Sequence, residues 1–257
     1  MKTSVIVPVL YEEDQLQPTL DRLAGLQGVD VEVVVVVDVP DASREAAVRA
    51  TNDTVAARSG AVVVYRVGQR GFGSALRKGF DVATGDVVVP FMGDESDDPE
   101  TIPSMVEKIG QGFDVVAGSR YMKGGAIIGD TAKQRLSRVY STLVRLAGGP
   151  KIHDVSNAFK AYRRSVVERI DTEADSFDIS VELTVKAHQA GFRIGEIPTV
   201  WTNRQLGASN FRMGRELGNY GRWLLLALRG RRQGWGRRAK TTPGGMTAAT
   251  DPPGGKQ

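Results

Sequence analysis

The chain has 257 residues, 41% of them hydrophobic and 25% charged, which is typical of a globular protein with one large domain or at most two. It has no cysteine, so disulfides and thiolate metal sites are excluded, and its two histidines disfavour a histidine-rich metal site. The start leads directly into a strand-like segment with no room for a signal peptide, and no apolar run approaches the roughly 18 residues of a membrane-spanning helix. We therefore expect a cytoplasmic protein.

The net charge of +4 is unevenly distributed along the chain. Between Arg212 and Lys240, Glu216 is the only acid among many arginines, whereas the rest of the chain is mildly acidic. A local basic cluster indicates a polyanionic partner, either a membrane surface or a nucleic acid.

Strand-like and helix-like segments alternate through the first half of the chain. Leucines at helical spacing follow the first apolar run, and Gly25 and Gly28 mark the end of that helix. Short connections between alternating elements predict right-handed βαβ units and a parallel sheet. The predicted strands are 4–9, 31–37, 61–66, 87–92 and 113–118.

The most informative stretch is 84–103, where the apolar run 87–92 ends abruptly in a cluster of carboxylates. Such a run is typical of a buried parallel strand, and its carboxyl end is where open α/β sheets bind their ligands. Asp94, Asp97 and Asp98 supply hard oxygen ligands that suit Mg²⁺ or Mn²⁺ held against substrate phosphates. The alternative is a solvated acidic turn in which Asp98 caps a helix that opens at Pro99.

A glycine-rich stretch, 68–75, follows the third predicted strand. It matches a dinucleotide-binding loop only superficially, because it does not follow the first strand and no acid follows at the required distance. A glycine turn that lets a helix pack closely on the sheet is the simpler account. Arg70 is a candidate to reach a phosphate from this turn.

The second half departs from simple alternation. Arg120 and Lys123 follow the fifth strand, where they can bind carboxylates or phosphate or form structural ion pairs. His153 beside Asp154 is either a base with its orienting acid or the donor of a loop hydrogen bond. The remaining predicted elements are a helix at 131–146 with Arg135 and Arg138, a strand at 159–162, a helix at 179–190 with Glu182, and a strand at 193–201.

Eight short motifs occur in an order that resembles a known family. They are Val5-Ile6-Val7-Pro8 with Tyr11-Glu12-Glu13, Asp38 with Asp41, Gly71-x-Gly73-x-Ala75 with Gly79, Ala83-x-Gly85-Asp86, Asp94, Gly118-Ser119-Arg120-Tyr121, Asp154-x-Ser156, and Glu196-x-Pro198 with Arg204-x-x-Gly207-x-Ser209. Over about residues 3–211 the chain resembles the family-2 inverting glycosyltransferases of GT-A fold. Within that family it looks most like the polyprenyl-phosphate sugar synthases, of which dolichol-phosphate mannose synthase is the namesake.

The resemblance implies an α/β, Rossmann-like, mostly parallel sheet in a single catalytic domain, 1–211, and it implies roles for individual residues. The nucleotide of the donor would be held by Pro8, Tyr11, Glu12, Glu13, Asp38, Arg70 and Gly71. Asp94 belongs to the DxD motif that carries Mg²⁺ or Mn²⁺, with Asp97 and Asp98 beside it. The acceptor phosphate would be held by Arg120, Arg135, Arg204 and Ser209, and the catalytic set would be Asp94, Asp97, Asp98, Arg120 and Arg204.

Three positions depart from the family pattern. Met92 stands where the first DxD aspartate is expected, so the metal would rely on Asp94 and on the downstream carboxylates. Asn157 stands where a glycine is common, and Asn210 where a lysine is common. The loss of that lysine leaves Arg204 to help bind phosphate.

The residue types fit transfer of a sugar from a nucleotide-sugar to a polyprenyl phosphate. The leaving diphosphate needs a metal and basic side chains, and an anionic lipid phosphate needs no general base. The runner-up, a sugar-hydroxyl acceptor in glycan assembly, requires a carboxylate base, which Glu95, Asp97 or Asp98 could supply. The acidic cluster argues against a nucleic-acid-binding protein or scaffold, and an acidic first loop argues against a nucleotidyltransferase.

The segment 212–240 is predicted to form a basic amphipathic helix. Leu217, Tyr220, Leu224, Ala227 and Leu228 share one face, with Trp223 at its edge. This pattern predicts a helix that lies in the bilayer interface and holds the enzyme peripherally at the inner face of the membrane. The alternative is that this face packs on the catalytic domain or on a second subunit, which leaves a homo-oligomer open. Residues 241–257 are expected to be disordered.

Overall fold

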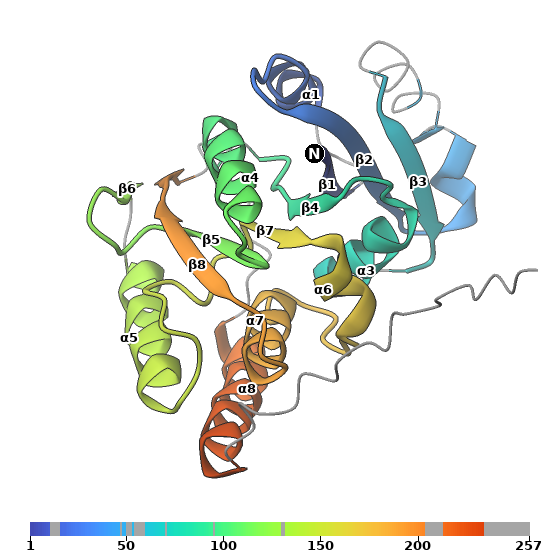
Figure 1. The fold of residues 1–257 in the computed structure, drawn as a ribbon. Helices are drawn as coiled ribbons and strands as arrows, with labels where there is room; N and C mark the ends of the chain where they lie inside the picture. The colour runs from blue at the N-terminus through green and yellow to red at the C-terminus, as the bar shows by residue number, and fades with distance from the viewer. Residues whose placement is uncertain are drawn as a thin grey trace, which may run out of the picture.

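The structure, a computed structural model, describes residues 1–10, 16–46, 48–49, 53, 60–69, 71–94, 96–129, 132–203 and 213–233. Within these residues the chain forms a main mixed sheet with helices on both faces and a second sheet of two strands (Figure 1). The main sheet has seven strands in the described residues, in the order β3-β2-β1-β4-β7-β5-β8. They are β1 (Lys2–Leu10), β2 (Asp30–Val39), β3 (Val62–Val67), β4 (Val87–Pro90), β5 (Val115–Ser119), β7 (Lys160–Arg163) and β8 (Ile194–Pro198).

The centre of the sheet is parallel, as the sequence predicts. β1 pairs with β2 on one side and with β4 on the other, so that Val5 lies opposite both Val33 and Val89. These strands are rich in valine because both faces of the sheet are covered. Val5 belongs to the core on one face and Ile6 to the core on the other.

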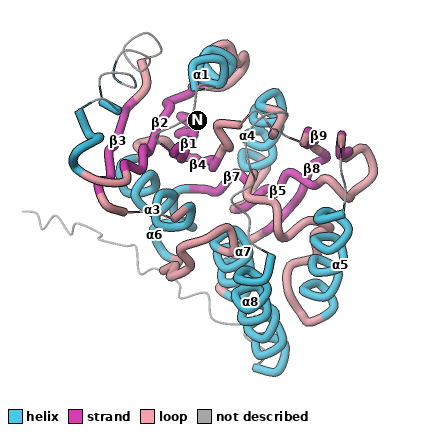
Figure 2. Tube along the Cα trace, turned by 180° about the vertical axis from the view of Figure 1, so that it is seen from behind, coloured by secondary structure: helices cyan, strands magenta, loops and turns pink. Residues whose placement is uncertain are grey.

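Helices cover the two faces in separate groups (Figures 1 and 2). Leu20 of α1 and Met105 of α4 pack in one core, and Leu76 of α3 and Ile179 of α7 pack in the other. The helices include α1 (Leu16–Ala24), α3 (Phe72–Val82), α4 (Ile102–Gly110), α5 (Ala132–Leu146), α6 (Arg164–Arg169), α7 (Ile179–Gln189) and α8 (Met213–Gln233), with a 3₁₀ turn η1 (Pro99–Thr101) before α4.

Strand β7 breaks the parallel pattern. It is inserted between β4 and β5 and runs antiparallel to both, with Tyr162 opposite Val88 and Ala161 opposite Val116. The insertion separates the acidic strand end after β4 from the strand end that carries Arg120. Both ends nevertheless point to the same edge of the sheet, because β4 and β5 have the same direction.

The last predicted strand, 193–201, is not continuous, which corrects the expectation. β8 ends at Pro198, and β9 (Val200–Thr202) leaves the main sheet to pair with β6 (Ala126–Ile128). Proline cannot donate to a ladder, and the buried Thr199 turns inward, where its hydroxyl lies 3.1 Å from that of Thr101. The chain therefore changes sheets at Thr199.

The helix predicted at the C-terminus, α8, packs on the rest of the domain through part of the face that was expected to enter a bilayer. Trp223 is only 2% exposed, and its indole Nε1 donates to Asp178 Oδ2 at 2.7 Å. Ala227 is fully buried, and the hydroxyl of Tyr140 on α5 donates to the carbonyl of Tyr220 at 2.8 Å. The interfacial position expected for Trp223 is therefore wrong, and the packing alternative holds for the described part of α8.

No helix in the described ranges is long and apolar enough to cross a membrane. The domain boundary predicted at residue 211 and the tail predicted from residue 241 lie outside the described residues.

We expect Trp223→Ala to destabilise the fold by about 3–5 kcal/mol, because it leaves a large cavity and an unpaired buried Asp178. Leu225→Ala on the same helix is the matched control, since Leu225 is 57% exposed and its truncation should cost less than about 0.5 kcal/mol. Urea unfolding of both variants measures the difference. Equal, small losses would show that α8 is not part of the core.

Candidate active site at the carboxyl edge of the sheet

The predicted site residues that the structure describes gather at one edge of the sheet. Asp38 ends β2, Pro8 is near the end of β1, and Asp94 follows β4. Because these strands are parallel neighbours, their carboxyl ends meet. Tyr11, Glu12, Glu13, Arg70, Arg204 and Ser209 lie outside the described residues, so their predicted roles stay predictions.

Asp94 occupies a tight turn directly after β4. Its Oδ1 accepts the backbone N–H of Ser96 at 3.1 Å and also the hydroxyl of Ser96. This local turn fixes the orientation of the carboxylate, which is half-buried at the sheet edge.

Asp97 is the unusual member of the acidic cluster. Its side chain is 2% exposed, and its Oδ1 has no hydrogen-bond partner in the described part of the chain. Burial and the nearby Asp94 raise the pKa of Asp97 to about 7, against the opposing charge of Arg120. A buried carboxylate oxygen without a partner is costly, and it is the kind of group that a bound cation satisfies.

Asp98 serves as a helix cap. Its Oδ1 accepts the backbone N–H of Glu100 at 3.3 Å at the start of η1, and it lies 3.6 Å from the guanidinium of Arg22 on α1. The capping role that the sequence offered as an alternative is therefore present.

The acidic loop is held in place by the segment that leaves the main sheet. Asp97 forms an isolated antiparallel bridge with Trp201, and the N–H of Thr202 donates to the carbonyl of Ser96 at 2.8 Å. Thr19 of α1 donates to the carbonyl of Gly93 from the other side at 3.3 Å. The position of Asp97 thus depends on β9 as well as on β4.

The side chain of Arg120 is engaged in a buried ion pair with Asp154 and is not exposed like a side chain that waits for a phosphate. Its Nε and Nη2 donate to the carboxylate of Asp154 at 2.6 and 3.0 Å, and its backbone N–H donates to the same group at 3.2 Å. Nη2 also reaches the hydroxyls of Ser137 and Ser156. Burial opposes both charges, but the mutual attraction outweighs it, so that the pKa of Arg120 is raised and that of Asp154 is lowered.

Lys160 is fully buried near the Arg120–Asp154 pair. Its ammonium donates to the carbonyl of Val155 at 3.0 Å and to that of Asn157. Burial lowers the pKa of Lys160 to about 7, although Asp154 opposes the shift. The lysine therefore fastens the loop that carries Asp154.

Asn157, which replaces a common glycine, has a structural role in this loop. Its Nδ2 donates to the carbonyl of Gly118 at 3.0 Å, and its backbone N–H donates to Asp154 Oδ1 at 3.1 Å. The asparagine thus ties the Asp154 loop to the end of β5.

His153 does not pair with Asp154, so the expectation of a base with its orienting acid is wrong. Its Nδ1 lies 2.5 Å from Glu196 Oε1 on β8, and its backbone N–H donates to Glu196 Oε2 at 2.8 Å. This is the loop hydrogen bond that the sequence offered as the alternative. Arg135 lies on α5 with an exposed side chain.

On the donor side, Asp38 is already engaged. Its two oxygens accept from Nε and Nη2 of Arg66 at 2.6 and 2.8 Å, and both side chains are buried. Arg66 Nη2 also lies 3.5 Å from the carbonyl of Gly71. Asp38 therefore supports the glycine turn through Arg66, and its predicted contact with the nucleotide is not tested by this geometry.

The glycine turn allows a close approach of two backbones. Gly71 has φ 133°, and a Cβ at Gly73 would lie 2.1 Å from the carbonyl oxygen of Ala174. The N–H of Gly73 donates to the carbonyl of Asp175 at 3.0 Å. The glycines thus admit the α6–α7 loop, and Gly79, about two turns further along α3, provides the predicted close packing on the sheet at Ile6.

Glu182 of α7 holds the α6–α7 loop in place. The sequence did not identify it as a site residue. It is fully buried, and its carboxylate accepts the backbone N–H groups of Glu173 and Ala174 at 2.9–3.1 Å and the ammonium of Lys186 at 2.6 Å. Glu182 is the one acid in the α7 sequence, which is the signal that could have found it, but most of its partners are backbone groups that a sequence pattern does not identify.

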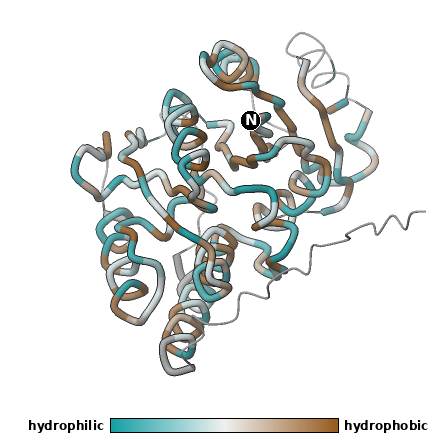
Figure 3. The backbone as a smooth tube through the Cα atoms, viewed as in Figure 1, coloured by the Kyte–Doolittle hydropathy of each residue, from teal (hydrophilic) through white to brown (hydrophobic). Residues whose placement is uncertain are grey.

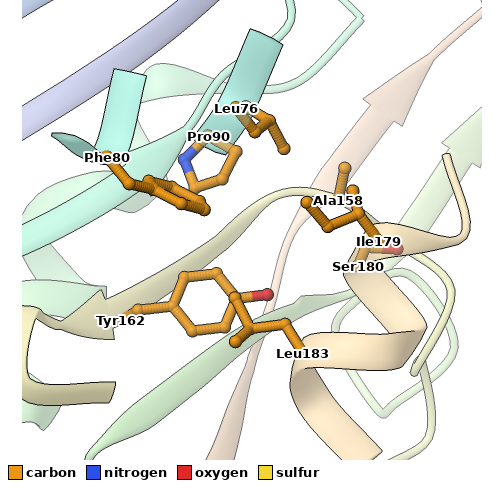
Figure 4. A pocket seen from close by; sticks show the side chains of 8 residues that line it. All are labelled: Leu76, Phe80, Pro90, Ala158, Tyr162, Ile179, Ser180 and Leu183. Carbon is orange, nitrogen blue, oxygen red and sulfur yellow. The ribbon is translucent and has the colours of Figure 1, made fainter. Parts of the chain in front are cut away.

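A small cavity of about 10 Å³ lies between α3, β4, β7 and α7, with the Tyr162 ring on one side (Figure 4). It is apolar and has room for about one water molecule, so it is a packing defect and no substrate site. It is lined by Leu76, Phe80, Pro90, Ala158, Tyr162, Ile179, Ser180 and Leu183.

Among the described residues, which do not include Glu95, no three acidic or histidine side chains lie close enough together to enclose a metal ion. Asp94 and Asp97 nevertheless form a pair at the sheet edge, where the unpartnered oxygen of Asp97 needs a positive charge. Mg²⁺ in nucleotide sites is commonly held by one or two carboxylates together with substrate phosphates. The pair therefore fits a divalent ion.

Three known proteins are similar to this chain in sequence. The chain is 32% identical over 217 residues to a dolichol-phosphate mannosyltransferase of Pyrococcus furiosus and 35% identical over 154 residues to a polyprenol monophosphomannose synthase of Mycolicibacterium smegmatis. These alignments cover 82% and 57% of this chain, but only 60% and 58% of the two relatives. An undecaprenyl-phosphate mannosyltransferase of Micrococcus luteus is 31% identical, with 88% of this chain and 96% of that enzyme covered.

Solved structures agree on the fold. Glucosyl-3-phosphoglycerate synthase from Mycobacterium tuberculosis, solved with Mn²⁺, uridine diphosphate and glucosyl-3-phosphoglycerate, superposes with a TM-score of 0.61 at 21% identity. The match covers 90% of this chain and 79% of that one. At this identity the likeness establishes the architecture and leaves the substrate open.

The family-2 resemblance and the α/β fold predicted from the sequence are thus both confirmed. Residues 4–171, which include the strand ends, the acidic loop and the Asp154 loop, match the model of glycosyl transferase family 2. On this match and on the M. luteus relative, the chain belongs to glycosyl transferase family 2.

Proposed function

We propose that this chain transfers a hexose from a nucleotide-sugar to a polyprenyl phosphate, with inversion and with help from Mg²⁺ or Mn²⁺. The observation that carries the chemistry is the buried Oδ1 of Asp97, which has no hydrogen-bond partner among the described residues and lies beside Asp94 after β4. The names of the relatives from P. furiosus, M. smegmatis and M. luteus support the polyprenyl-phosphate acceptor and favour mannose. Because the chain covers less than two thirds of the first two, substrate and activity are proposals.

Asp94 and Asp97 are the residues that would hold the ion. When bound, a divalent cation there would neutralise the negative charge that develops on the leaving nucleoside diphosphate. Ser96 orients Asp94 and the bridge to Trp201 orients Asp97, so neither carboxylate needs to reorganise during the reaction. Asp98, engaged at the start of η1, is left to its capping role.

The acceptor phosphate is an anion, so its attack needs cationic positioning and no proton acceptor. Arg120 is already bonded to Asp154, Ser137 and Ser156, so we assign it to hold the strand end in place. The exposed Arg135, with Arg204 and Ser209, then remain the candidates for contact with the acceptor phosphate. An acceptor of this kind is embedded in a membrane, so the enzyme would work at a membrane surface.

The second candidate is transfer to a sugar hydroxyl. One observation favours it: burial raises the pKa of Asp97 to about 7, which suits a general base at neutral pH. Its position beside Asp94 favours the metal role instead, because a cation would return the Asp97 carboxyl to its ionised form.

We expect Asp94→Asn and Asp97→Asn each to weaken Mn²⁺ binding in the presence of nucleoside diphosphate by more than about 100-fold, because each removes a direct ligand. A proton on Asp97 competes with the cation, so wild-type affinity should fall as pH is lowered from 8 to 6, below the Asp97 pKa of about 7, and Asp97→Asn should lose this slope. Calorimetric titration with Mn²⁺ measures both effects.

Asp98→Asn is the matched control for the metal site and should keep both the affinity and its pH dependence. An equal loss in Asp98→Asn would return Asp98 to the metal set. An unchanged slope in Asp97→Asn would remove Asp97 from it.

The proposed reaction is tested by incubating the purified chain with radiolabelled GDP-mannose or UDP-sugars and a polyprenyl phosphate. We expect label in an organic-extractable, acid-labile product, and none when a chelator is present or when dephosphorylated polyprenol replaces the phosphate. Label that appears only in water-soluble oligosaccharide would establish the hydroxyl acceptor instead.

A further inference from the structure

Helix α5 carries a stripe of apolar side chains that is largely exposed. Leu136, Val139, Leu143 and Leu146 are 44%, 56%, 46% and 65% exposed. Their spacing of three, four and three residues places them on one face of the helix. We call these four residues the α5 stripe.

The opposite face of α5 is the one that joins the core. Val144 is fully buried, Ser141 is 1% exposed, and the ring of Tyr140 packs edge-on against Tyr220 of α8 at 4.9 Å. The helix is therefore anchored without using the stripe. Figure 3 shows apolar and polar segments alternating along α5, and Figures 1 and 2 show α5 at the periphery of the molecule.

The charges on α5 have one sign. Its sequence contains Lys133, Arg135, Arg138 and Arg145 and no acid, and the side chains of Arg135 and Arg138 are exposed. A helix with an exposed aliphatic stripe flanked by arginines matches a surface that is apolar inside and negatively charged outside. The surface of an anionic lipid bilayer has both properties.

The stripe begins next to the proposed acceptor side of the active site. The hydroxyl of Tyr121, which follows Arg120, donates to the carbonyl of Gln134 at 2.9 Å and to Ser137 at 2.8 Å. The guanidinium of Arg138 lies 6.0 Å from the Tyr121 ring centroid. The first turns of α5 thus touch the strand end where the acceptor phosphate would enter.

We infer that the α5 stripe is the surface that rests on an anionic phospholipid bilayer, with its leucines in the interface and its arginines at the lipid phosphates. The inference rests on the proposed function, because a bilayer-embedded acceptor requires the site to face the lipid. It moves the lipid contact expected for α8 to α5, since Trp223 and Ala227 of α8 are buried against the domain, although Leu228 of α8 is 42% exposed.

A second copy of the chain is the less suitable occupant. A two-fold interface places the same patch on both subunits, so α5 against α5 would bring arginines against arginines with no acid on either helix to offset them. A bilayer of anionic lipids offers opposite charge to every one of them.

The test is flotation of the full-length chain with vesicles of phosphatidylcholine and phosphatidylglycerol. We expect wild-type binding that falls at high salt, and at least about tenfold weaker binding for Val139→Glu/Leu143→Glu, because two charges enter the interface. Val62→Glu is the matched control, since Val62 is 42% exposed on β3 at the other end of the sheet, and it should bind like the wild type. Leu143→Ser is a milder second variant in case the double variant fails to fold.

Activity separates this inference from the proposed function. The double variant should keep wild-type turnover with a short, water-soluble polyprenyl phosphate and lose it with long-chain acceptor in vesicles. Undiminished vesicle binding by both stripe variants would overturn the inference, as would a loss confined to dimerisation in light scattering. Absence of wild-type transfer to any polyprenyl phosphate would overturn the proposed function, while the flotation result would still decide the lipid contact.

Discussion

The carboxylate of Asp154 is the group on which the geometry of the site depends. It has no exposure to solvent, and it accepts hydrogen bonds from the side chain and backbone of Arg120, from Ser156 and from the backbone of Asn157. One buried negative charge therefore joins the end of β5 to the loop before β7. Breaking such a pair leaves an uncompensated charge in the interior, so the two segments are held together far more firmly than a surface ion pair would hold them.

Much of the architecture follows from local patterns in the sequence. Unbroken valine runs require a sheet covered on both faces, and the carboxylates after β4 lie at the edge where a parallel sheet binds ligands. Pro198 inside the run 193–201 was a local signal for the end of a strand. The pairing of the following residues with β6 and the contact between Thr199 and Thr101 were not predictable, because both join residues far apart in the sequence.

The acidic residues of the site could be predicted from the sequence, but the ion-pair partners within the site could not. Asp94 and Asp97 stand out by type and position, whereas the pairing of Arg120 with Asp154 joins residues on two separate elements. Amphipathicity was equally ambiguous. The stripe on α8 that resembles a lipid-binding face is a packing face centred on Trp223, while α5 exposes leucines that its sequence pattern did not single out. Periodicity identifies an apolar face, and only the tertiary structure identifies what covers it.

Because of the bridge between Asp97 and Trp201, the number of residues between β8 and β9 affects the position of Asp97 in the site. Side chains in extended segments alternate between two faces, so one residue inserted between Pro198 and Trp201 would present the opposite face of β9 to the acidic loop. The Thr202 hydrogen bond to Ser96 would be lost in the same step, and Asp97 would leave its buried position. The number of residues at the β8–β9 junction is therefore as much a part of the site as its carboxylates.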